Sequence, residues 1–166
     1  MSDPDETTQL INLLESVDIQ PHLLEGGLAQ FSDKAKNAAA AKIASAFVPP
    51  PPGRVLGRLL YILTPENRTQ IETALIANLR SPDASARRFS LYGLDQLAHS
   101  ASVDFALQAL RDDDESVALA ATTILLAKAK DESNIKSLLQ GFYQTSKQQG
   151  AFETVVNLLE THGFRE

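Results

Sequence analysis

Two stretches decide the fold: RSPDASARRFSLYGLDQLA at residues 80–98 and RDDDESVALAATTILLAKA at residues 111–129. The second stretch repeats the pattern of the first position by position, so that Asp83 aligns with Asp114. In the first stretch, apolar or small residues recur at helical spacing, which predicts one continuous buried face on a helix. These positions are Ala86, Phe89, Ser90, Gly93, Leu94 and Leu97. An internal repeat of this kind is typical of stacked helical units that bury their apolar faces against one another.

A shorter amphipathic helix is predicted before each of these two helices, over residues 67–79 and 102–110. A third pair follows, with apolar residues at helical spacing over 135–142 and 152–159. The sequence lacks Asn-Gly and Asp-Gly hairpin turns and shows no sustained alternation of apolar and polar residues. The predicted fold is therefore all-α, with about three antiparallel helical hairpins.

Residues 1–48 are expected to form an N-terminal helical block. A short amphipathic helix is predicted over 7–16 and a weaker one over 21–30, where two glycines lower the helix propensity. An alanine-rich helix is predicted over 34–48, and Ser32 before it is a typical N-cap.

Four consecutive prolines at 49–52, followed by Gly53, interrupt the helical pattern. Such a run favours the polyproline II conformation, which makes it a stiff elbow between two helical parts. A proline-rich ligand for a partner is the alternative interpretation. The expected organisation is an N-terminal block at 1–48, an elbow at 49–53 and a repeat stack at 54–166, packed as one compact unit.

Two further helix starts share a pattern, Thr-Pro-Glu at 64–66 and Ser-Pro-Asp at 81–83. A hydroxyl N-cap satisfies a backbone amide, a proline suits the first helical position, and an acid suits the positive end of the helix dipole. The sequence therefore predicts that helices begin at Pro65 and Pro82.

The stretches quoted first resemble HEAT-like repeats, which carry an aspartate in the turn, then a small apolar residue and an arginine, then an alanine-rich run. Asp83, Ala86 and Arg87 match this pattern, whereas the second copy has Ala118 where arginine is expected. The resemblance covers about residues 65–161 and is nearest to the HEAT repeats of the phycobilisome-lyase type. It implies a right-handed α-solenoid of stacked hairpins, and it implies little about function.

The composition excludes several classes of partner. The net charge of −6 disfavours nucleic acid and anionic membranes, which recruit clusters of Lys and Arg. The chain has no cysteine, so disulfides, thiolate nucleophiles and cysteine-bound metals are excluded. The acidic start has no apolar run of the kind found in signal peptides, and a cytoplasmic protein is expected.

No catalytic, cofactor-binding or metal-binding residues are predicted. His22, His99 and His162 lie far apart in the sequence and outside any ligand-like cluster. The acidic run at 112–115 lacks the spacing and the glycine of a calcium loop, and it is best explained by favourable negative charge at the start of a helix. The segment 53–57 lacks the Gly-Lys-Ser ending of a phosphate-binding loop.

A partner-binding surface is predicted on the second helix of each hairpin, on the face opposite the core stripe. In HEAT-like proteins this helix lines the concave side. Aromatic, arginine and aliphatic side chains together are typical of protein interfaces. The candidate residues are Arg87, Arg88, Leu91, Tyr92, Leu119, Thr123 and Leu126. The alternative is that the N-terminal block covers this face.

The function predicted from the sequence is a non-enzymatic scaffold that binds another protein. The resemblance leaves an alternative open, a phycobilin-lyase-like or chaperone-like component acting on a pigment-protein. A third possibility is a structural subunit, in which the helix at 34–48 pairs between copies to form a homo-oligomer.

Overall fold

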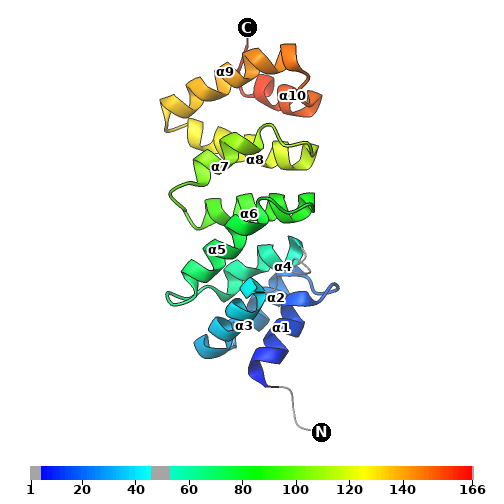
Figure 1. Ribbon diagram of the computed structural model, residues 1–166, viewed down its shortest axis with the longest axis vertical. Coiled ribbons are helices and arrows are strands. Elements are labelled where there is room, and N and C mark those ends of the chain that lie inside the picture. The colour runs from blue at the N-terminus through cyan, green and yellow to red at the C-terminus, as the bar shows by residue number, and fades with distance from the viewer. Residues whose placement is uncertain (1–4, 46–52, 166) are drawn as a thin grey trace. The chain divides into compact units, whose positions relative to one another are not determined.

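The computed structural model describes residues 5–45 and 53–165, and within these ranges every regular element is a helix (Figure 1). The predicted all-α class is confirmed. The chain divides into two compact units, Met1–Leu94 (unit 1) and Asp95–Glu166 (unit 2). None of the described helices is long and apolar enough to cross a membrane.

Unit 1 begins with the predicted N-terminal helices and continues through two hairpin helices. Its elements are α1 (Glu6–Glu15), α2 (Pro21–Ala29), α3 (Asp33–Ser45), α4 (Gly53–Arg58), the 3-10 helix η1 (Leu59–Ile62), α5 (Arg68–Asn78) and most of α6 (Ala84–Gln96). The three N-terminal helices lie where the sequence predicts them, except that positions 46–48 fall outside the described residues. The proline run at 49–52 also lies outside them.

Arginines of α4 join the N-terminal helices to the rest of unit 1. Arg58 donates from Nη1 to the carbonyl oxygen of Leu14 at 2.7 Å and to that of Ser16 at 2.5 Å. Arg54 reaches the carbonyl oxygen of Glu15 at 3.4 Å. The last carbonyls of a helix lack partners within the helix and carry the negative end of its dipole, so guanidinium groups stabilise them. The end of α1 is therefore held by α4.

Helix α3 packs against α1, α5 and η1. Its buried side chains are Ala35, Ala39, Ala40 and Ile43. The expected boundary at 49–53 thus differs from the boundary between the units, because helices on both sides of the proline run share one core. The apolar face of α3 is used within the chain, and the pairing between copies expected for residues 34–48 stays a prediction.

The start of α3 carries the predicted cap. The Oγ of Ser32 accepts from the amide of Ala35 at 3.2 Å. Glu6 of α1 in turn accepts from the Ser32 amide at 2.6 Å and from its hydroxyl at 2.7 Å. These bonds lower the pKa of the Glu6 carboxyl below its ordinary value, because they stabilise the charged form.

Helices α5 and α6 begin later than predicted. Thr64 and Asn67 close a turn by reciprocal bonds, since the Thr64 amide donates to Asn67 Oδ1 at 2.8 Å and the Asn67 amide donates to Thr64 Oγ1 at 3.2 Å. The hydroxyl of Thr64 also donates to Asn37 of α3 at 2.5 Å. In the turn before α6, Ser81 Oγ accepts from the Asp83 amide at 3.1 Å. The hydroxyls therefore close turns before the helices instead of capping them.

Two glycines allow helices of unit 1 to approach closely. A Cβ on Gly57 of α4 would lie 2.7 Å from Cδ1 of Phe89, and a Cβ on Gly93 of α6 would lie 2.9 Å from Cδ1 of Leu75. Any larger side chain at these positions would displace the neighbouring side chain. Gly93, which belongs to the predicted buried face of α6, therefore allows close packing, and so does Gly57 at the end of segment 53–57.

Unit 2 contains α7 (Ser102–Ala109), α8 (Glu115–Ala129), α9 (Ser133–Gln149) and α10 (Glu153–Thr161). All four match the predicted helices. Helix α8 contacts α7, α9 and α10, and it lies among them in Figure 1. Its buried residues are Val117, Ala118, Ala120, Ala121, Thr122, Ile124, Leu125 and Leu126.

The two aligned turns are built in the same way. Asp83 Oδ1 accepts from the amide of Ser85 at 2.9 Å, and Asp114 Oδ1 accepts from the amide of Ser116 at 2.9 Å. The amide of each aspartate also donates to the side chain two residues earlier. The Asp114 amide donates to Asp112 Oδ1 at 2.9 Å, and the Asp83 amide donates to Ser81 Oγ at 3.1 Å. The aspartates of the sequence repeat are therefore equivalent N-caps.

Candidate functional site

The seven residues predicted to bind a partner fall in both units. Arg87, Arg88, Leu91 and Tyr92 belong to α6 in unit 1, and Leu119, Thr123 and Leu126 belong to α8 in unit 2. Tyr92 is 36% exposed and Thr123 is also exposed, whereas both arginines and Leu119 are half-buried.

Leu91 and Leu126 are buried, and the prediction that they lie on the surface is wrong. Leu91 is 3% exposed and Leu126 is 7% exposed. Helix α8 contacts three other helices, so its solvent face is narrow: Thr123 lies on it, whereas Leu126 is covered. Helix α6 buries Ser90 and Leu91 besides Gly93 and Leu94, which makes its buried arc wider than the predicted stripe.

Only part of the predicted face on α6 remains at the surface. The guanidinium of Arg87 donates to the carbonyl oxygen of Ser81 at 2.9 Å and supports the turn before the helix. The guanidinium carbon of Arg88 lies 5.2 Å from the centre of the Phe89 ring, within the range of a cation–π interaction. Arg88 and Tyr92 stand at i and i+4 and are therefore neighbours on the same side of the helix.

Two of the three histidines, His99 and His162, make local contacts. His99 accepts the amide of Ala101 through Nδ1 at 3.2 Å, and its ring stacks on Phe105 at 6.1 Å. Nδ1 of His162 lies 2.9 Å from the carbonyl oxygen of Leu158. Among residues 5–45 and 53–165, no three His, Cys, Asp or Glu side chains gather in a group suited to a metal ion.

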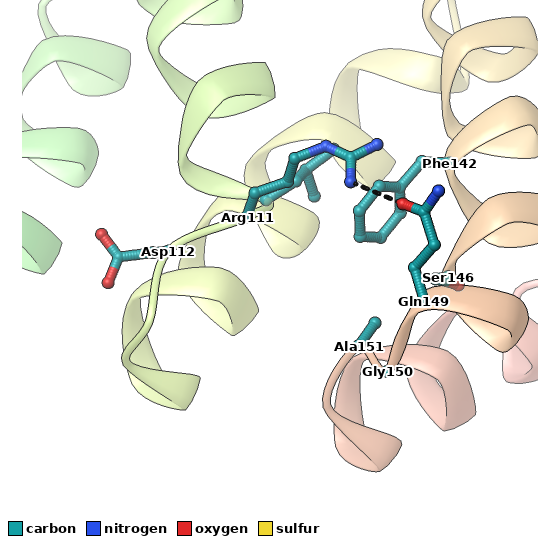
Figure 2. A pocket seen from close by; sticks show the side chains of 8 residues that line it. Arg111, Asp112, Phe142, Ser146, Gln149, Gly150 and Ala151 are labelled. Atoms are coloured by element: carbon teal, nitrogen blue, oxygen red, sulfur yellow. Dashed lines mark hydrogen bonds between the residues drawn. The ribbon is translucent and has the colours of Figure 1, made fainter.

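A pocket of about 170 Å³ lies in unit 2 between the turn after α7 and the end of α9 (Figure 2). It is lined by Leu110, Arg111, Asp112, Phe142, Ser146, Gln149, Gly150 and Ala151. Helix α9 ends at Gly150, which adopts the left-handed conformation with φ of 79° that favours glycine at this position. This ending turns the chain towards α10 and places Ala151 in the pocket wall.

Arg111 and Gln149 point towards each other across the pocket in Figure 2, beside the ring of Phe142. The guanidinium carbon of Arg111 lies 5.7 Å from the centre of that ring. Its Nη1 donates to Oε1 of Gln149 at 3.3 Å. The exposed guanidinium is thus held by an aromatic face and an amide rather than by a carboxylate among the described residues.

Leu138 extends this surface along α9. It stands at i relative to Phe142 at i+4, so the two side chains are neighbours on one side of the helix. Leu138 is 50% exposed, and Phe142 is half-buried. Aromatic residues and arginine are enriched at protein interfaces, and the exposed leucine adds apolar area beside them.

The backbone donors of the pocket wall are already used. The amides of Gly150 and Ala151 both donate to the carbonyl oxygen of Ser146, at 3.2 and 3.3 Å. The hydroxyl of Ser146 donates to the carbonyl oxygen of Tyr143 at 2.8 Å. A ligand would therefore meet the side chains of Arg111 and Gln149 as its hydrogen-bond donors.

The size of the pocket limits what it can hold. At about 170 Å³ it is smaller than the roughly 300–1,000 Å³ typical of pockets for small molecules and cofactors. It is large enough for a side chain of a partner. A tetrapyrrole such as a bilin exceeds this volume, so the pocket gives no support to the lyase-like alternative.

Sequence reasoning missed this pocket. Arg111 and Phe142 lie far apart in the sequence, and the helical pattern assigns each of them only to its own helix or turn. The available signal was local: Gly150 predicts a helix end, and an arginine ends the short helix before the acidic run at 112–115. Nothing in a single sequence pairs these two places.

Comparison of the chain with family models, with curated proteins and with solved structures found no match. The candidate site therefore rests on the geometry of this chain alone.

Proposed function

We propose that the protein is a helical module that binds another protein and has no catalytic role of its own. The observation that carries this proposal is the surface of α9 in unit 2, where exposed Leu138 lies beside Phe142 and Arg111 holds its guanidinium over the phenyl ring. We call Arg111, Leu138, Phe142 and Gln149 the α9 patch. Binding energy at interfaces is concentrated in a few side chains, arginine and aromatic ones above all, that meet around small pockets, and the α9 patch offers this arrangement.

A second contact is proposed on α6 in unit 1, at Arg88 and Tyr92. It is the part of the predicted surface on α6 that is left, because Leu91 is buried and Arg87 supports the turn before the helix. An acidic residue at Tyr92 should weaken partner binding without unfolding the protein. Leu126 does not serve this purpose, because a charge at a buried position destabilises the fold itself.

The arrangement of helices is proposed to be a right-handed HEAT-like solenoid of three hairpins. Support comes from the two aspartate turns, because the aligned residues Asp83 and Asp114 make the same capping bonds. Such scaffolds carry binding surfaces rather than active sites in most of their uses.

The proposal is tested by cross-linking in an extract of the native organism. A benzophenone amino acid at Leu138 should give a covalent adduct with a defined protein, because this side chain lies in the α9 patch. The same amino acid at Gln144 is the matched control, since Gln144 is exposed on another side of α9. Equal labelling from both positions, or none from Leu138, contradicts the proposal.

The captured protein is then purified and its binding measured by calorimetry. Leu138→Asp should weaken binding by at least ~10-fold, because an interface hot spot contributes more than about 1 kcal/mol. Gln144→Asp carries the same charge change and should leave the affinity within about 2-fold. Circular dichroism of both variants checks that the helices are intact.

A further inference from the structure

We propose that the pocket of the α9 patch binds the C-terminal carboxylate of a partner polypeptide that ends in a small apolar residue. This inference rests on the proposed function, because it names the feature of the partner that the same site recognises. The carboxylate would bind Arg111, and the last side chain would enter the pocket.

The cation is the first argument. Arg111 is exposed, and among residues 5–45 and 53–165 its guanidinium forms no ion pair with a carboxylate. The guanidinium carbon lies 5.7 Å from the centre of the Phe142 ring, and Nη1 donates to Gln149, so the group is held from two sides. A guanidinium fixed in this way presents parallel N–H groups that match the two oxygens of a carboxylate.

The charge of unit 2 favours a singly charged ligand. Unit 2 has eleven acidic and six basic residues, which gives a net charge of −5, whereas unit 1 has ten acidic and nine basic residues, which gives −1. Four acids directly follow Arg111, at 112–115. Asp112 points away from the guanidinium in Figure 2, yet these charges repel a dianion such as phosphate more strongly than a carboxylate.

The size and lining of the pocket favour the end of a chain. Leu110, Phe142 and Ala151 contribute apolar surface, and the volume of about 170 Å³ suits one side chain. A C-terminal residue carries its carboxylate and its side chain on the same Cα, so it can contact the arginine and the apolar wall together. An internal aspartate or glutamate has only methylene groups next to its carboxylate and no separate apolar side chain on the same carbon.

Recognition would depend on side chains. The amides of Gly150 and Ala151 are engaged with the carbonyl oxygen of Ser146. The remaining donors are the guanidinium of Arg111 and the Nε2 group of Gln149, whose Oε1 accepts from that guanidinium. Substitution of Arg111 should therefore remove most of the affinity for the carboxylate.

The test uses the full chain and two peptides, acetyl-Gly-Ser-Gly-Val with a free carboxylate and the same peptide as an amide. Binding is followed by NMR through the Nε–H of Arg111, the side-chain amide of Gln149 and the backbone amide of Gly150. The free acid should shift these signals and bind at least ~10-fold more tightly than the amide, because charge-assisted bonds to the carboxylate are lost in the amide.

Substitutions of Arg111 test separately the positive charge of its side chain and the geometry of the guanidinium. Arg111→Met should reduce binding of the free acid to the level of the amide. Arg111→Lys should restore only part of the affinity, since lysine keeps the charge but loses the two-pronged contact and the stacking. Lys136→Met removes an exposed cation elsewhere on α9 and should change nothing.

Three peptide-binding outcomes overturn the inference: no binding of the free acid, equal binding of acid and amide, or equal binding of an amidated peptide with an internal glutamate. An unchanged affinity in Arg111→Met also overturns it. The proposed function fails separately, through cross-linking at Leu138. Specific cross-linking together with equal binding of acid and amide would support the protein-binding function and overturn only the proposed recognition of a C-terminal carboxylate.

Discussion

Helix α8 in unit 2 buries apolar or small residues against three neighbouring helices, whereas the ends of the N-terminal helices in unit 1 are held by polar side chains from distant segments. Arg58 holds the end of α1 across 44 residues of sequence. Thr64 reaches α3 across 27 residues, and Glu6 reaches the start of α3 across 26. Apolar packing thus organises the second unit around one helix, and polar bonds fix the first unit's N-terminal helices in place.

Because of this difference, substitutions should lower the stability of the two units in different ways. A core helix surrounded by neighbours loses stability through cavities. A helix end held by arginine loses it through carbonyls that are left without partners. The following substitutions test this contrast, in order of decreasing expected effect.

Leu125→Ala should lower the free energy of unfolding by about 2–5 kcal/mol, because Leu125 is fully buried in α8 and its loss leaves a cavity. Thr123→Ala, nearby on the exposed side, should change it by less than about 0.5 kcal/mol. Urea denaturation followed by circular dichroism measures both. Similar effects at the two positions would contradict the central role of α8.

Arg58→Met should cost about 1.5–3 kcal/mol, because it removes charge-assisted bonds to two carbonyl oxygens and keeps most of the apolar stem. Arg80→Met is the matched control at an exposed arginine of unit 1, with an expected change below about 0.5 kcal/mol. Urea unfolding compares the two variants. If Arg58→Met were no worse than Arg80→Met, the arginine contact would be dispensable.

Asp114→Ala should cost about 1 kcal/mol, in the range typical of an N-cap. The carboxylate of Asp114 accepts from the amides of Ser116 and Val117. The corresponding variant, Asp83→Ala, should cost less, since its carboxylate accepts from the helix amide of Ser85 without the second helix amide that Asp114 has. Thermal unfolding of both variants ranks them, and the reverse order would show that the second amide adds nothing to the strength of the cap.

The smallest effect concerns pH. Bonds from Ser32 lower the pKa of Glu6 from its ordinary value of 4.5, so its contribution to stability is present above that value and is lost as the pH falls through the lowered pKa. Glu6→Gln should therefore flatten the acid side of the stability profile. Glu66→Gln, at another exposed glutamate, serves as the control. A profile equally steep in wild type and Glu6→Gln would rule out this contribution.

Much of the fold is readable from the sequence, because helical periodicity and caps are local signals. The serine cap of α3 and the four helices of unit 2 were predicted in this way, whereas Asp83 and Asp114 were expected as favourable charges at helix starts and are N-caps. The predicted starts of α5 and α6 are too early, since Thr64 bonds to Asn67 and Ser81 bonds to Asp83 in turns that precede each helix. A cap motif and such a turn use the same residue types.

The candidate site was less predictable than the fold. The predicted exposure of Leu91 and Leu126 assumes that a helix is buried along one apolar stripe and exposed elsewhere. This assumption fails when a helix has neighbours on several sides. The α9 patch joins Arg111 and Phe142 from different parts of unit 2, and no local pattern signals such a pair. The sequence also gives no signal for the boundary between the two units after Leu94, inside α6, because the proline run is the more conspicuous break.

The bonds from Arg58 to the end of α1 also bear on the order of folding. In unit 2, α8 packs against the helices directly before and after it in sequence, and closing a short loop costs little entropy. The arginine must instead find carbonyls 42 and 44 residues away, after α1 and α4 have formed. We expect this contact to form late, after the transition state for folding. Its main effect would then be to slow the opening of the native N-terminal helices, with little influence on how fast the chain folds.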